Sequence, residues 1–140
     1  MKIAVIDTNI ASFFYGDRPE LELYREACEG KRIEVGFQTV AELLQGAELR
    51  GWGAERRRNL RAFIRGLRVV PYDLGLAKAW ASVSAKSIGN GRSLTDGDAW
   101  IAATAVYRRA TLVTHDRDFV DLDIDGLDVV CHAPESSGGT

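Results

Sequence analysis

Short apolar runs and helical apolar spacings alternate along the chain. Residues 3–6 (Ile-Ala-Val-Ile) are an unbroken apolar run, which is typical of a strand buried on both faces. Further short runs predict strands at 33–37, 69–72, 111–114 and 127–130. Apolar residues at helical spacing predict helices over about 9–15, 19–29, 39–50, 54–67, 73–88 and 96–108. This order predicts a three-layer α/β/α domain with a largely parallel central sheet.

The length and composition predict one folded domain. The chain has 140 residues, of which 46% are hydrophobic and 27% charged, the profile of a globular protein rather than a disordered one. We expect residues 1–132 to form the domain. The last residues, 133–140, are rich in Ser and Gly and are expected to be disordered.

Charge and cysteine content exclude several classes of function. Eighteen basic and twenty acidic residues give a net charge of −2, so bulk charge predicts no particular partner. Cys28 and Cys131 lie far apart and show no zinc-binding spacing. The chain has neither an apolar run of about 18 residues nor a leader pattern, so we expect a cytoplasmic protein without a membrane segment.

Acidic residues follow two of the predicted strands and begin one of the predicted helices. Asp7 comes directly after 3–6, and Asp116 lies two residues beyond 111–114. Asp98 heads the apolar stripe of the helix over 96–108, which faces the sheet. Because the carboxyl ends of parallel strands share one edge, we expect these carboxylates to lie close together.

Each acid also has a local structural interpretation. Asp7 and Asp73 are favoured helix N-caps, and Asp116 and Asp118 are favoured turn residues. Thr95 and Asp98 have the spacing of a capping box, with Asp96 as an alternative cap, and so do Thr39 and Glu42. Periodicity alone makes Glu42 structural. Capping alone does not explain why several acids are expected at the same edge of the sheet.

Converging carboxylates favour a hard cation. Carboxylates within a few ångströms repel each other, which raises their pKa values unless a cation neutralises them. Oxygen ligands without cysteine or clustered histidine suit Mg²⁺ or Mn²⁺, and such ions can activate water for phosphodiester cleavage.

Four short motifs follow one another along the chain. They are Asp7-Thr-Asn9, Thr39-Val-Ala-Glu-Leu43 with Gly46 after it, Asp98-Ala-Trp-Ile-Ala-Ala103, and Leu112-Val-Thr-His-Asp116 with Asp118-Phe119. In order and spacing these motifs resemble those of a PIN domain, and the chain length is similar to that of toxin ribonucleases of VapC type. The resemblance runs from Lys2 to about Val130.

The resemblance implies an endoribonuclease that uses Mg²⁺ or Mn²⁺, forms a homodimer, and has a VapB-type antitoxin partner that binds in or near the active cleft. It implies a catalytic, metal-binding site of four acids, with two further acids as second choices and polar neighbours that orient them. The four acids are Asp7, Glu42, Asp98 and Asp116, the second choices are Asp96 and Asp118, and the orienting residues are Thr8, Asn9 and Thr114.

The segment from Arg50 to Arg68 holds seven arginines and one acid, Glu55, a local net charge of +6. Arg57, Arg61 and Arg65 share one helical face, and arginine suits phosphate contacts. We therefore expect this face to bind RNA, with a merely solvated surface as the alternative.

The tryptophans and histidines give weaker evidence of function than the acidic and arginine-rich segments. Trp80 and Trp100 lie in apolar helical segments and are expected to pack, whereas Trp52, between two glycines, is a candidate for a contact with a partner or a second copy. His115 and His132 are too isolated in the sequence to predict a metal site or a catalytic nucleophile.

Two rival classes remain to be distinguished. A dehalogenase-like phosphoacceptor needs a second acid two residues after the first, where Asn9 stands. A non-catalytic RNA- or protein-binding module fits the same pattern if the acids are caps, and such a module should gain no stability from Mn²⁺.

Overall fold

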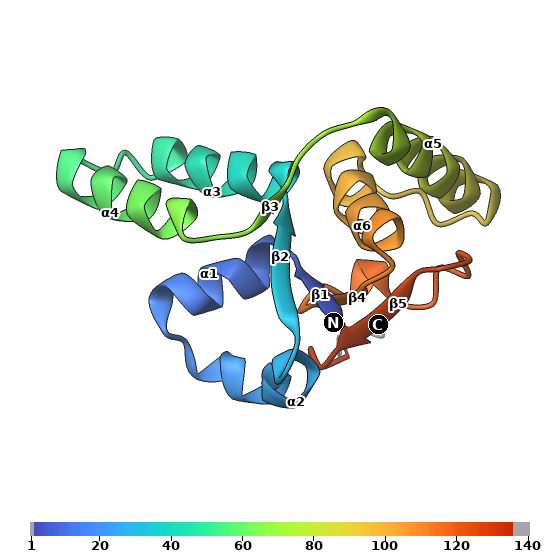
Figure 1. The fold of residues 1–140 in the computed structure, drawn as a ribbon, viewed down its shortest axis with the longest axis horizontal. Coiled ribbons are helices and arrows are strands. Elements are labelled where there is room, and N and C mark those ends of the chain that lie inside the picture. Colours follow the sequence, from blue (N-terminus) through green and yellow to red (C-terminus); the bar gives the residue numbers. More distant parts are fainter. Residues whose placement is uncertain (1, 136–140) are drawn as a thin grey trace.

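The structure is a computed structural model, and it describes residues 2–135. Helical and strand elements alternate along most of the chain (Figure 1). The strands are β1 (Ile3–Ile6), β2 (Arg32–Gly36), β3 (Val69–Val70), β4 (Thr111–Thr114) and β5 (Asp128–Cys131). The helices are α1 (Thr8–Gly16), α2 (Arg25–Cys28), α3 (Phe37–Leu49), α4 (Ala54–Arg65), α5 (Leu74–Gly89) and α6 (Asp96–Arg108), with 3-10 turns η1 (Pro19–Tyr24) and η2 (Arg117–Phe119).

The strands form one parallel sheet in the order β3-β2-β1-β4-β5. The register pairs Ile6 of β1 with Val113 of β4. The residues that follow them, Asp7 and Thr114, are therefore neighbours. The backbone N–H of Asp7 donates to the Val113 carbonyl at 3.1 Å. The predicted parallel sheet is therefore confirmed, and its central strand is β1.

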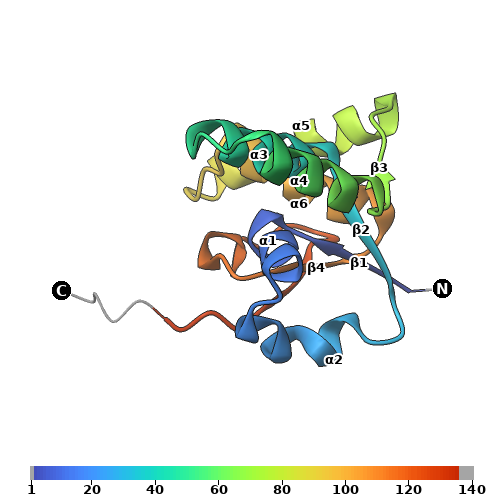
Figure 2. The same ribbon diagram turned by 90° about the vertical axis from the view of Figure 1, so that its left-hand side faces the viewer.

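Helices cover both faces of the sheet, as the predicted three-layer fold requires. Ala4 and Ile6 point into a core with α1, η1, α3 and α4, whereas Val5 points into a second core with α5 and α6. Figure 2 shows α6 and α2 on opposite sides of the strands. The all-apolar pattern of β1 follows from this burial on both faces.

Short polar side chains begin three of the helices. Asp7 accepts a hydrogen bond from the Ile10 N–H at 3.0 Å, and Asp73 accepts one from the Leu76 N–H at 2.9 Å. The Thr95 hydroxyl accepts from the Asp98 N–H at 3.2 Å. These contacts confirm the predicted caps at the starts of α1, α5 and α6.

The capping box expected at Thr39 and Glu42 is wrong. Helix α3 begins at Phe37, after Gly36, so Thr39 lies inside its first turn, where it is fully buried. Strand β2 also ends at Gly36 rather than Phe37. A Cβ at Gly36 would lie 2.8 Å from Thr104 Oγ1 of α6, so this close approach of β2 and α6 requires glycine. The helix start is therefore set by tertiary packing.

Two other expected elements differ from the structure. The helix expected over 19–29 is a 3-10 turn followed by the short α2, and the strand expected over 69–72 has only two residues. Pro19 stands in the first turn of the 3-10 segment, where its missing N–H costs no hydrogen bond. Pro71 ends β3 because it has no N–H for the sheet.

A buried ion pair joins β2 to α6. Glu34 is only 3% exposed, and both of its oxygens accept from Arg108 at 2.7 and 3.0 Å. Arg32 pairs with the same carboxylate at 3.1 Å. The sequence pattern did not indicate this pair.

The expected disordered tail lies mostly outside the described residues, which end at 135. Cys28 and Cys131 are both free thiols. No helix among residues 2–135 is long and apolar enough to cross a membrane.

Candidate acidic active site

Asp7 lies at the carboxyl end of β1 and is 3% exposed. One of its oxygens accepts from the Ile10 N–H, and the other accepts from the Thr114 hydroxyl at the end of β4. The pKa of Asp7 is raised to about 6, mainly by burial and less by the charges of Asp116 and Asp98, against the opposing effect of its two hydrogen bonds. The cap and the candidate site thus use the same carboxylate.

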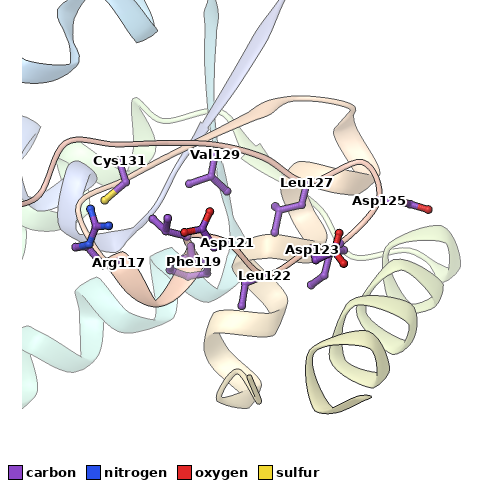
Figure 3. A pocket seen from close by; sticks show the side chains of 11 residues that line it. Arg117, Phe119, Asp121, Leu122, Asp123, Asp125, Leu127, Val129 and Cys131 are labelled. Atoms are coloured by element: carbon purple, nitrogen blue, oxygen red, sulfur yellow. The ribbon is translucent and has the colours of Figure 1, made fainter. Parts of the chain in front are cut away.

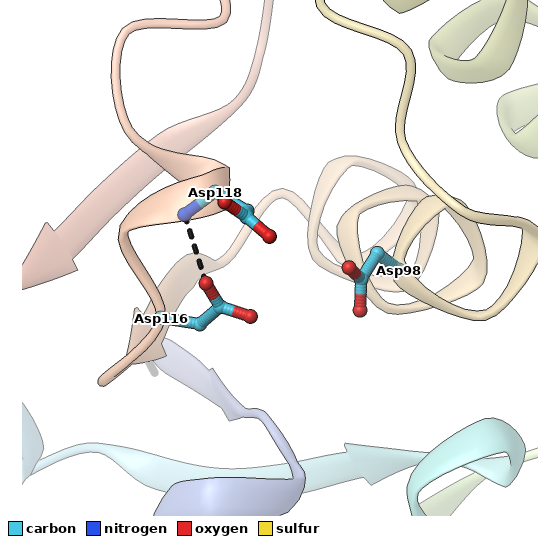
Figure 4. Close-up of side chains that lie close together, drawn as sticks. All are labelled: Asp98, Asp116 and Asp118. Atoms are coloured by element: carbon cyan, nitrogen blue, oxygen red, sulfur yellow. Dashed lines mark hydrogen bonds between the residues drawn. The ribbon is translucent and has the colours of Figure 1, made fainter.

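Asp98, Asp116 and Asp118 form the acidic cluster. Each offers an oxygen that lies within 4.8 Å of the others (Figure 4). Asp98 comes from the first turn of α6, whereas the other two come from the turn after β4. The Asp118 N–H donates to Asp116 Oδ1 at 2.9 Å, which fixes this turn. Partial burial, with repulsion from Asp116, raises the pKa of Asp98.

Glu42 approaches this cluster from α3. Its carboxylate accepts from the Thr8 hydroxyl of α1 and from Gln38 Nε2 at 3.2 Å. The charge of Glu42 contributes to the raised pKa of Asp98, which places the two acids within electrostatic reach. Glu42 therefore turns toward α1 and α6 rather than capping its own helix.

Gly97 makes room for this approach. A Cβ at Gly97 would lie 2.7 Å from Gln38 Nε2 and 3.4 Å from Glu42 Oε2. Neither Gln38 nor Gly97 was among the residues predicted for the site. The only signal in the sequence was a glycine between two acids in a helical first turn, where glycine is unfavourable without a packing reason.

The other residues predicted for the site differ in how close they lie to the acidic cluster. Thr114 holds Asp7 and also accepts from the Asp116 N–H at 2.9 Å. Asn9 lines a cleft beside Glu42. Asp96 is exposed and outside the cluster, and its backbone carbonyl accepts from Trp80 Nε1 at 3.3 Å. Asp118, a second choice for the metal site that was also expected to be a turn residue, is a member of the cluster.

The donor set of this edge fits a hard divalent cation. The cluster offers carboxylate oxygens alone. Repulsion from Asp116 and Asp118 contributes to the raised pKa of Asp98. A divalent ion would offset that repulsion, and oxygen-only coordination suits Mg²⁺ or Mn²⁺. Asp98, Asp116 and Asp118 are the residues that could hold such an ion.

His115 and His132 meet on Tyr24, although they are distant in sequence. The Tyr24 hydroxyl lies 2.5 Å from His115 Nδ1 and accepts from the His132 N–H at 3.0 Å. Phe13 packs edge-on against His115. This group links the ends of β4 and β5 next to the turn that carries Asp116.

The acid-rich segment after η2 is an exposed loop. Phe119 and Leu122 are buried beneath it, and Leu127 and Val129 help to line a shallow pocket (Figure 3). Asp121, Asp123 and Asp125 are exposed, and Asp125 points outward at the bend.

The arginine-rich segment forms α4 and its flanks, and its arginines differ in their contacts. Arg57 pairs with Glu48 and donates from Nε to the Trp52 carbonyl at 2.5 Å, whereas Arg61 and Arg65 are exposed.

The rings of Trp80 and Trp100 stack with their centroids 5.2 Å apart, which confirms that these two side chains pack.

Comparisons with known proteins identify the family of this chain. The PIN domain profile matches residues 4–125. Ribonuclease VapC5 of Mycobacterium tuberculosis is 32% identical over 101 residues, covering 70% of this chain and 74% of that protein. VapC ribonuclease Y4jK of Sinorhizobium fredii is 28% identical over 135 residues, covering 90% and 94%.

A solved structure agrees. The DNA-bound VapBC structure from Salmonella typhimurium contains a chain that superimposes with a TM-score of 0.73 at 25% identity, over 94% of this chain and 98% of that one. The sheet order, the acids at its carboxyl edge and these matches lead to one conclusion. The chain belongs to the PIN domain family and is similar to its VapC-type members.

Proposed function

We propose that this protein is a metal-dependent endoribonuclease and the toxin of a VapBC-type toxin–antitoxin pair. The observation that carries the proposal is the arrival of acids from β1, α3, α6 and the β4 turn at one edge of the sheet, two of them with raised pKa values. The ribonuclease names of the relatives support the reaction.

The chain's own residues would build the site in two groups. Asp98, Asp116 and Asp118 would hold the cation, while Asp7 and Glu42 complete the acidic edge. Thr114 and the Ile10 N–H orient Asp7, and Thr8 and Gln38 orient Glu42. Bound Mg²⁺ or Mn²⁺ would supply activation of water and charge stabilisation at the scissile phosphate.

The partners proposed are an RNA substrate, a VapB-type antitoxin and a second copy of the chain. The VapBC complexes among the structural relatives support the antitoxin. The arginine-rich segment supports RNA, because seven arginines stand against a single acid there.

The test is cleavage of a mixed pool of structured RNA by the purified protein in Mg²⁺, in Mn²⁺ and in chelator. We expect discrete cuts that require metal and disappear in Asp7→Asn and Asp98→Asn. Asp125→Asn is the matched control, because this carboxylate is exposed and points away from the cluster. Asp96→Asn is expected to keep activity, since its side chain lies outside the cluster.

Two results would contradict the proposal. Cuts that persist equally in chelator or in Asp98→Asn would remove the acidic cluster from the reaction. No cuts under any metal, in a folded protein whose melting temperature Mn²⁺ does not change, would favour a non-catalytic RNA- or protein-binding module.

A further inference from the structure

A cleft of about 600 Å³ begins at the acidic site and runs between α1 and α3 toward α4. Thr8, Asn9 and Glu42 line its acidic end. Arg50 and Trp52 line its other end. Arg50, the C-cap of α3, follows Glu42 by eight positions, which corresponds to about 12 Å along the helix at ~1.5 Å per residue. The cleft therefore runs from the Glu42 side of the acidic edge to a cationic end.

Trp52 gathers two guanidinium groups at that end. The Cζ atoms of Arg56 and Arg50 lie 5.4 and 5.9 Å from its ring centroid. Tyr15 of α1 supports the same ring, with a centroid separation of 6.3 Å. Cation–π contact restrains a guanidinium against the ring while leaving its N–H groups free to donate.

The neighbouring Arg57 differs from these two arginines because its donors are already engaged. It pairs with Glu48 and donates to the Trp52 carbonyl. Within the described part of the chain, neither Arg50 nor Arg56 pairs with a carboxylate. Their positive charge is therefore available to a ligand.

Gly46 leaves space for Arg50. A Cβ at Gly46 would lie 2.6 Å from Arg50 Nη1, so the guanidinium lies across the bare backbone one helical turn earlier. Gly46 also lines the cleft. A mid-helix glycine costs about 1 kcal/mol relative to alanine, and this approach gives that cost a reason.

We propose that Arg50 and Arg56, oriented by Trp52, form a subsite that binds the RNA backbone phosphates that lie beyond the scissile phosphate. This inference rests on the proposed function. It differs from the sequence-based expectation, which favoured Arg57, Arg61 and Arg65 on one face of α4.

Charge favours a polyanion in this cleft. A substrate strand brings a negative charge at each nucleotide, and the acidic site can accept only the portion that a cation neutralises. The ~12 Å between Glu42 and Arg50 along α3 places these guanidinium groups beyond the acidic site, where neighbouring phosphates of a bound strand would lie. Two neighbouring guanidinium groups at that distance offer the bidentate donors that phosphates prefer.

The experiment compares steady-state cleavage of one RNA by the full-length protein and three double variants. Arg50→Ala/Arg56→Ala is expected to raise KM about tenfold with kcat within about twofold, because an interaction that is equal in the ground and transition states affects KM alone. The plot of log KM against log salt should become shallower by about 0.7 for each phosphate that the variant no longer binds. Lys78→Ala/Lys86→Ala, which removes two exposed cations of α5, is the charge-matched control.

Arg61→Ala/Arg65→Ala distinguishes the subsite from diffuse attraction. We expect a change in KM smaller than that of Arg50→Ala/Arg56→Ala. An equal or larger change would overturn the subsite in favour of the exposed face of α4.

Gly46→Ala tests the orientation without removing a charge. Alanine favours the helix, so folding is protected, yet its Cβ displaces the Arg50 guanidinium. Trp52→Phe keeps an aromatic ring and should give a smaller rise in KM than Trp52→Leu. Unchanged KM in both Gly46→Ala and Trp52→Leu would overturn the role of Trp52 in orienting the subsite.

Failure of this inference is distinguishable from failure of the proposed function. If the wild type cleaves RNA but Arg50→Ala/Arg56→Ala keeps its KM and salt slope, only the subsite is wrong. If that variant instead escapes inhibition by a protein partner while KM is unchanged, the cleft end binds protein and the RNA subsite is overturned. Absence of cleavage by the wild type would contradict the proposed function itself.

Discussion

At the scale of single residues, Asp7 shows how one side chain can satisfy local and tertiary demands together. Its carboxylate caps α1 through the Ile10 N–H and accepts from Thr114 across the sheet. Neither interaction removes the cost of burying its charge, since its pKa remains raised to about 6. Burial therefore makes the ionised form of Asp7 costlier than it is in the unfolded chain, and a cation bound nearby would offset that cost.

This raised pKa predicts how stability depends on pH. The pKa of Asp7 rises from 3.8 unfolded to about 6 folded, so the stability that its protonation contributes is fully present below 3.8 and is lost as pH rises through about 6. At neutral pH without metal, Asp7→Asn should be more stable than the wild type, with a free energy of unfolding higher by on the order of 2 to 3 kcal/mol.

The measurement is urea unfolding in chelator at several pH values between about 4 and 8, a range that brackets the folded pKa of Asp7. The difference between Asp7→Asn and wild type should shrink as pH falls, because the wild-type carboxyl is then neutral too. A difference that is constant across this range would mean that Asp7 does not titrate there.

At the scale of elements, the site depends on how closely α6 approaches α3 and β2. Gly97 of α6 faces Gln38 and Glu42 of α3, and Gly36 at the end of β2 faces Thr104 of α6. An ion pair between β2 and the last residue of α6 fastens the opposite end of that helix. These contacts set where Asp98 and Glu42 stand.

Gly97→Ala should lower activity more than it lowers stability. The new Cβ would force Gln38 to move and would break its hydrogen bond to Glu42, while alanine improves helix propensity. We expect a several-fold loss of kcat with a melting temperature within a few degrees of wild type. An unchanged kcat would show that Gln38 does not position Glu42; Gly89→Ala, with open space around its Cβ position, is the control.

Arg108→Ala should destabilise the fold by about 2 kcal/mol, because it leaves the buried Glu34 carboxylate with Arg32 as its remaining partner. Urea unfolding of this variant, of Glu34→Gln and of the double variant gives a double-mutant cycle. The double variant should lose less stability than the sum of the two single variants, since no buried carboxylate is left short of a partner. Additive losses of stability would show that the pair is not coupled.

At the scale of the whole molecule, the acidic edge is assembled from parts that are distant in sequence. Asp7 and Thr114 are 107 positions apart, yet the parallel pairing of β1 with β4 makes them neighbours. Asp98 reaches the same edge because α6 begins there and packs along the sheet. A ligand that bridges these elements would therefore stabilise the fold as a unit.

Mn²⁺ should raise the melting temperature of the wild type by several degrees. An ion at about a hundred times its dissociation constant stabilises the state that binds it by about 2.7 kcal/mol. Asp98→Asn should abolish most of this shift, whereas Asp125→Asn should keep it, because only the former belongs to the cluster. Thermal scans of the three proteins with and without Mn²⁺ make the measurement, and equal shifts in all three would exclude this cluster as the ion's site.

The sequence alone predicted the fold class and most of the elements. The apolar run of β1, the caps Asp7, Asp73 and Thr95, and the helical stripe of α6 are local patterns, and the structure confirms each of them. It also indicated that Asp7, Asp98 and Asp116 share an edge, because parallel strands place their carboxyl ends together.

Only the tertiary structure decided how the site is assembled. Glu42 looked like a helix cap because its local spacing fits one, but its partners Thr8 and Gln38 and the space at Gly97 come from packing across three helices. Asp118 joins Asp98 and Asp116, and the two histidines meet on Tyr24, through contacts that no periodicity encodes. Local patterns determine which elements form because they act over a few residues, whereas side chains meet across elements only after the chain has packed.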